Sequence, residues 1–104
     1  MTPELLIQNI KREIESLVSL YSEGARGGTE VGIKLDSLGL DQEVKERVLN
    51  LIHQSINEYT YNLICGFEGE ASLAGTQEAY AITDESGNKL SGNLAALYYE
   101  QVME

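Results

Sequence analysis

Residues 41–66 read DQEVKERVLNLIHQSINEYTYNLICG, and this stretch decides the fold expected for the chain. Large apolar side chains recur in it every three or four residues, which is the spacing of one face of an α-helix. Asp41 is a favourable N-cap residue, Glu43 suits the positive end of the helix dipole, and Gly66 suits a helix end. We therefore expect a long amphipathic helix here, with an apolar stripe that consists of Val44, Val48, Ile52, Ile56, Tyr59 and Leu63.

A second long helix is expected at the N-terminal end of the sequence. Thr2, Pro3 and Glu4 form a good helix start, because threonine caps free amides and proline suits the first helical position. The apolar stripe that follows consists of Ile7, Ile10, Ile14, Leu17 and Tyr21, and the helix is expected to end at Gly24. Two long helices with matching stripes predict an antiparallel pair that packs stripe against stripe.

The remaining segments predict a small sheet and a last helix. Residues 80–83 alternate like a strand, residues 84–88 form a turn, and residues 89–90 begin a returning strand. Residues 31–35 also alternate, but Gly32 weakens a strand, so a third strand and an extended linker both stay open. Ser91 or Asn93 is expected to cap a C-terminal helix. The predicted fold class is α+β: an antiparallel pair of long helices, a small antiparallel β-hairpin or three-stranded sheet, and a C-terminal helix, in a single domain over residues 1–104.

The charge of the chain is strongly negative and unevenly distributed. The net charge is −10, and residues 58–104 contain eight acidic residues against the single cation Lys89. Such a field repels nucleic-acid phosphates and anionic membranes, so neither is expected as a partner, whereas basic proteins are attracted. One cysteine cannot form an internal disulfide, and no signal peptide or long apolar run is evident, so we expect a cytoplasmic protein.

No arrangement of reactive residues predicts catalysis, a cofactor or a metal site. His53 and Cys65 fall twelve residues apart on one predicted helix, roughly 18 Å along its axis, so they cannot form a dyad. Ser72 matches neither common serine-nucleophile motif, and the turn at 84–88 lacks the glycine and glutamate positions of a calcium loop. An enzyme built on the acidic loop and Ser72 would need a concave pocket beside them. We therefore predict no enzyme activity.

Tyrosine is the unusual component of the composition, with six tyrosines against one phenylalanine and no tryptophan. Tyrosine is enriched at protein interfaces because its ring buries area while its hydroxyl keeps a polar partner. Our hypothesis is a non-enzymatic interaction domain that binds a basic protein, for example as an inhibitor or immunity-type binder. Its predicted contact residues are Tyr61, Glu68, Glu70, Glu78, Tyr80, Asp84, Glu85, Tyr98 and Tyr99.

The alternative hypothesis is a structural or regulatory homodimer whose excess charge maintains solubility. Its interface would be the stripe of the first helix, which could pair with its own copy. The residues of that stripe are Ile7, Ile10, Ile14, Leu17 and Tyr21.

Overall fold

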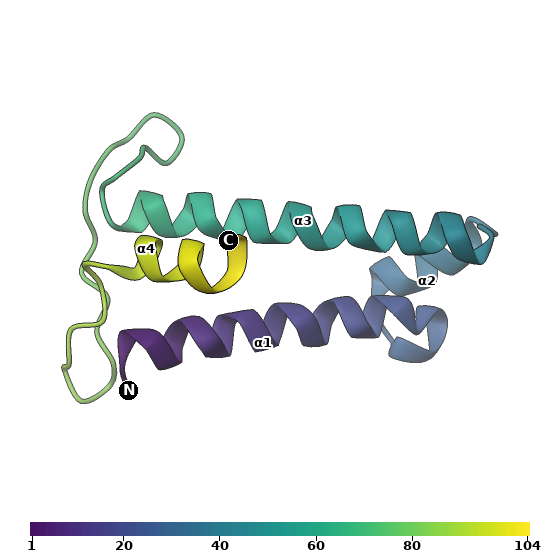
Figure 1. The fold of residues 1–104 in the computed structure, drawn as a ribbon, viewed down its shortest axis with the longest axis horizontal. Coiled ribbons are helices and arrows are strands. Elements are labelled where there is room, and N and C mark those ends of the chain that lie inside the picture. Colours follow the sequence, from purple (N-terminus) through teal and green to yellow (C-terminus); the bar gives the residue numbers. More distant parts are fainter. The chain divides into compact units, whose positions relative to one another are not determined.

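The computed structural model describes residues 1–104 and is 65% helical, with four α-helices and no β-strand. In chain order the elements are α1 (Pro3–Ser22), the 3₁₀ turn η1 (Gly24–Gly27), α2 (Glu30–Ser37), α3 (Gln42–Phe67), α4 (Leu94–Tyr98) and the π-helical turn η2 (Tyr99–Met103) (Figure 1). The chain divides into two compact units, which we name unit 1 (Met1–Lys11 and Asn57–Glu104) and unit 2 (Arg12–Ile56). None of the helices combines the length and the apolar character that crossing a membrane requires.

The two long helices predicted from the apolar stripes are confirmed, and both begin as expected. The hydroxyl of Thr2 accepts a hydrogen bond from the N–H of Leu5 at 3.1 Å, at the start of α1. The carboxylate of Asp41 accepts from the N–H of Val44 at 2.9 Å, at the start of α3. Each side chain thereby satisfies one of the amides that an α-helix leaves free at its first turn.

Both alternatives for residues 31–35, a third strand and an extended linker, are wrong, because these residues belong to helix α2. The hydroxyl of Thr29 accepts from the N–H of Gly32 at 2.9 Å, which is a side-chain N-cap. Gly32 is buried, and a Cβ atom there would lie 2.6 Å from the carbonyl oxygen of Gly24. The glycine that seemed to weaken a strand is thus the residue that lets α2 approach η1 closely.

The predicted β-hairpin over residues 80–90 is also wrong, although the turn at its centre is confirmed. The carboxylate of Asp84 accepts hydrogen bonds from the N–H groups of Ser86 and Asn88 at 3.0 and 2.9 Å. Pairing on either side is limited to one antiparallel bridge between Thr83 and Lys89. A returning strand has no room to lengthen, because Leu90 turns into the core at 5% exposure and α4 begins at Leu94. The fold is therefore helical rather than α+β.

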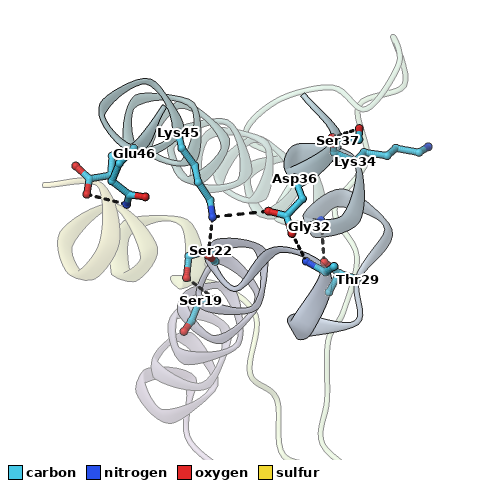
Figure 2. Close-up of polar contacts among 11 residues, drawn as sticks. Ser19, Ser22, Thr29, Gly32, Lys34, Asp36, Ser37, Lys45 and Glu46 are labelled. Carbon is cyan, nitrogen blue, oxygen red and sulfur yellow. Dashed lines mark hydrogen bonds and ion pairs between the residues drawn. The ribbon is translucent and has the colours of Figure 1, made fainter. Parts of the chain in front are cut away.

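Polar contacts fasten the connection between α1 and α3 within unit 2. The carboxylate of Asp36 accepts a hydrogen bond from the N–H of Ala25 at 2.7 Å and lies 3.9 Å from the ammonium group of Lys45. Lys45 also donates to the carbonyl of Ser22 at 3.1 Å, so α3 is tied to the end of α1 as well as to α2 (Figure 2). Glycine suits position 24, because its φ is 63° and a Cβ atom would lie 2.2 Å from the Asp36 carboxylate.

Each unit has its own buried apolar residues. In unit 1, α4 lies beside the last turns of α3 (Figure 1). Ile7 and Tyr98 are both fully buried there. The other buried side chains of unit 1 are Ile64, Cys65, Leu90, Leu94 and Ala95, and those of unit 2 are Ile14, Leu35 and Leu49. Burying each large side chain stabilises the fold by about 1.5–3 kcal/mol before conformational entropy is subtracted.

Candidate functional site

The excess negative charge of the chain is concentrated in unit 1. This unit contains nine acidic residues and the two cations Lys11 and Lys89, a balance of −7, whereas unit 2 contains eight acidic residues and five cations, a balance of −3. Most of the carboxylates of unit 1 are exposed, namely those of Glu4, Glu58, Glu70, Glu78, Glu85, Glu100 and Glu104. A field of one sign at exposed side chains attracts cationic partners over a distance of about one Debye length.

Two of the predicted contact residues have structural roles in unit 1. Glu68 is half-buried, and its carboxylate accepts hydrogen bonds from the N–H groups of Gly92 and Ala95 at the start of α4. Asp84 organises the turn at residues 84–88, and hydrogen bonds from Asn88 hold the pKa of its carboxyl below the ordinary value. Both carboxylates are therefore occupied within the chain, whereas those of Glu70, Glu78 and Glu85 are exposed.

Three of the tyrosines predicted to contact a partner form one cluster. The ring of Tyr61, on α3, lies 6.2 Å from that of Tyr98 and 5.8 Å from that of Tyr99, between centroids. Tyr98 is fully buried, and burial raises the pKa of its hydroxyl. A hydrogen bond with Cys65 raises the pKa of Tyr61. Tyr99 is 51% exposed, so it is the member of this cluster that presents a ring to a partner.

Tyr80 is not part of this cluster and lies at the edge of a hollow in the surface of unit 1. Its ring meets that of Phe67 edge-on, with centroids 6.1 Å apart, and the residue is 44% exposed. The hollow has a volume of about 300 Å³ and is lined by Glu68, Ala79, Tyr80, Ala81, Lys89, Ser91 and Gly92. The structure thus brings Tyr80 and Glu68 together at one hollow.

The backbone beside this hollow shows an alternating pattern of hydrogen bonds. The N–H of Tyr80 donates to the carbonyl of Phe67 at 2.7 Å, and that of Ile82 donates to the hydroxyl of Ser91 at 3.0 Å. The carbonyl of Ile82 accepts from the N–H of Leu90 at 2.8 Å. The backbone groups of Tyr80 and Ile82 are therefore hydrogen-bonded to the rest of unit 1. In a strand, alternate residues likewise direct their backbone groups to the same side.

Unit 2 has an apolar groove that was not apparent from the sequence. Two overlapping hollows of about 380 and 500 Å³ share Val31, Val48 and Ile52 as lining residues, and Leu38 and Leu51 lie along them. Leu38 and Leu51 are each 65% exposed. The signal was present in the stripe of residues 41–66, but burial of the whole stripe against another helix was expected. A contiguous exposed apolar surface is characteristic of protein interaction sites.

The homodimer hypothesis requires the apolar stripe of the first helix. Part of that stripe is already buried within the folded chain. Ile7 is fully buried and Ile14 is 8% exposed, while Ile10, Leu17 and Tyr21 are half-buried. Tyr21 also lines the apolar groove of unit 2. A dimer that used the whole stripe would first have to release Ile7 and Ile14 from their contacts within the chain.

The histidine and the cysteine considered from the sequence as reactive residues lie on one helix. His53 and Cys65 both lie on α3, which is continuous from Gln42 to Phe67, so their separation along the axis is that of twelve helical residues. No group of three or more histidine, cysteine, aspartate or glutamate side chains is close enough to hold a metal ion.

Comparison with known proteins adds no assignment to this description. No model of a protein family, no curated protein and no solved structure matches this chain.

Proposed function

We propose that this chain is a non-enzymatic interaction domain that binds a basic protein through unit 1. The observation that supports the proposal is the balance of −7 in unit 1, carried mostly by exposed carboxylates, together with the exposed rings of Tyr80 and Tyr99. Glu70, Glu78 and Glu85 supply charge that has no partner within the chain. Tyr98 is a core residue and is left out of the contact surface.

The two kinds of side chain do different work in such a surface. Carboxylates steer a cationic partner and raise its rate of association, an effect that salt weakens. Exposed tyrosine rings supply contact area that becomes buried in the complex and slows dissociation. An inhibitor or immunity-type binder of a basic enzyme or toxin is one concrete form of this function.

Affinity capture followed by a charge-matched comparison tests the proposal. A variant with Glu70→Gln, Glu78→Gln and Glu85→Gln removes three exposed charges from unit 1. A control with Glu13→Gln, Glu15→Gln and Glu23→Gln removes three exposed charges from unit 2 and has the same net charge. The captured partner is expected to be basic, and only the first variant should lower its association rate and flatten the salt dependence. Capture of no basic protein, or equal effects of both variants, would contradict the proposal.

Self-association is a second candidate function, which the apolar groove of unit 2 favours. Leu38 and Leu51 expose apolar surface that the same groove of a second copy would cover in a symmetric dimer. Sedimentation of the wild-type chain and of Leu51→Glu tests this candidate, with Ile10→Glu on the first-helix stripe as the comparison. A dimer that Leu51→Glu converts to a folded monomer is expected, and a wild-type chain that is monomeric at micromolar concentration would rule the dimer out.

A further inference from the structure

We propose that residues 79–83, which form no β-strand of their own, present a free backbone edge to which an extended basic segment of the partner adds by strand-like pairing. This inference rests on the proposed function, because it specifies how the basic partner is held. The segment reads Ala-Tyr-Ala-Ile-Thr and is followed by the turn at Asp84. Strand addition supplies affinity through main-chain hydrogen bonds and specificity through the flanking side chains.

The inner edge of this segment is already occupied. Antiparallel bridges link Ala79 to Glu68 and Thr83 to Lys89, so the segment is paired at both ends with other parts of unit 1. The N–H groups of Tyr80, Ile82 and Asp84 all donate in this direction. These bonds fix the segment in an extended form before any partner arrives, which lowers the conformational entropy lost on binding.

The outer edge is free. The N–H groups of Ala79, Ala81 and Thr83 donate to no acceptor within the chain, and all three residues are exposed. Alternation of bonded and free amides is the pattern of an edge strand, in which successive residues direct their N–H groups to opposite sides. A free row of this kind is a template for another strand.

The edge also contains neither of the two residue types that most often prevent pairing, proline and lysine. Natural edge strands are protected by proline, by lysine or by bulges. Residues 78–84 contain neither proline nor lysine, and the side chains of Ala79 and Ala81 are small enough for another backbone to approach. This part of the chain is therefore accessible to an incoming strand.

Charge identifies the occupant as basic. Glu78 precedes the edge and is exposed, and the exposed carboxylates of Glu70 and Glu85 belong to the same acidic unit. Lys89, which pairs with Thr83, is the one cation beside the edge, and the carboxylates of unit 1 outnumber it. The net field therefore attracts lysine or arginine side chains on the added segment. An extended peptide with cationic side chains at alternate positions fits both the backbone and the charge.

Amide hydrogen exchange measured by NMR on the full chain tests the backbone pairing. The probe is a short synthetic peptide of alternating lysine and valine. Binding is expected to slow exchange at Ala79, Ala81 and Thr83 while Tyr80 and Ile82 change little. Equal changes at odd and even positions, or none in this segment, would overturn the proposal.

Two matched comparisons isolate the hydrogen bonds from the charge. A peptide with the same sequence and charge, but with alternate backbone nitrogens methylated, cannot form the ladder. In the protein, Ala81→Pro removes one edge N–H, and Ala81→Ser keeps it. Proline is tolerated at a strand edge whose N–H faces solvent, so the variant is expected to fold. Each lost hydrogen bond should weaken binding about 2- to 10-fold, with Ala81→Ser unchanged.

The outcomes separate this inference from the proposed function. If the lysine-valine peptide binds with the expected salt dependence but is insensitive to methylation and to Ala81→Pro, strand addition is wrong and charge-driven docking stands. If exchange at the three edge amides slows without peptide as the chain is concentrated, the occupant is a second copy and the proposal of a basic segment is overturned.

Discussion

The carboxylate of Glu68 accepts a hydrogen bond at 2.9 Å from the backbone N–H of Ala95, which lies 27 residues further along the chain. The same carboxylate accepts from Gly92. The side chain of Asn93, the N-cap residue of α4, makes no capping bond. A residue directly after α3 therefore caps α4, and it closes the long irregular connection between these two helices.

Glu68→Ala is expected to destabilise the protein by about 1–2 kcal/mol, because it leaves two amides at the start of α4 without their acceptor. Urea unfolding followed by circular dichroism measures this change. Glu70→Ala is the control, since its side chain is exposed and its loss should change stability by no more than about 0.5 kcal/mol. Equal effects of the two substitutions would contradict the capping role.

Gly32→Ala should destabilise the protein even though alanine is the better helix former. Helix propensity alone favours alanine by about 1 kcal/mol. The added Cβ atom, however, would lie 2.6 Å from the carbonyl oxygen of Gly24, so backbone must move, at a cost of about 1–3 kcal/mol. Thermal unfolding measures the net change, with the exposed Ser37→Ala in the same helix as the control. A Gly32→Ala protein more stable than wild type would refute the close approach of α2 and η1.

Ala74→Asn is expected to stabilise the protein by about 0.5–1 kcal/mol. Leu73 and Thr76 exchange backbone hydrogen bonds at 2.8 and 3.0 Å, and the two residues between them both have positive φ, 50° at Ala74 and 87° at Gly75. A turn of this kind favours Asn-Gly, because asparagine tolerates the left-handed region better than alanine. Urea unfolding measures the gain, and an unchanged midpoint would show that this turn is not formed.

The stability of the protein should fall as the pH rises above 10. Burial raises the pKa of Tyr98 above its ordinary value of 10.0. The unfolded chain therefore releases this proton at a lower pH than the folded protein, so stability is lost between the two pKa values. Urea unfolding across this range should show a smaller loss in Tyr98→Phe. An equal loss in both proteins would assign the effect to other groups.

The long helices were predictable because their signals are local and repeated. The apolar side chains of residues 41–66 recur at helical spacing over many turns, and Asp41 caps the helix that they predict. The π-turn after Tyr98 and the short α4 have no such repetition, and the cap of α4 comes from Glu68, which is distant in sequence. Predicting that contact would have required the tertiary structure.

The prediction of a sheet was wrong, because an alternation of apolar and polar side chains over four or five residues does not distinguish a strand from a short helix. In residues 31–35, Val31 and Leu35 also have the spacing of one helical face, and Thr29 supplies the cap that selects the helix. The acidic residues were identifiable from composition, but their roles were not. Glu68 and Glu70 are two residues apart, and only the structure shows that one caps a helix while the other is exposed.

Cys65 is the single cysteine of the chain, and it is 9% exposed at the end of α3. A thiol reagent reaches it more readily when that part of unit 1 opens, because the residue is buried in the folded form. The rate at which Cys65 is alkylated therefore measures local unfolding of unit 1, and no label has to be introduced. A bound partner that stabilises unit 1 should lower the alkylation rate in proportion to its occupancy.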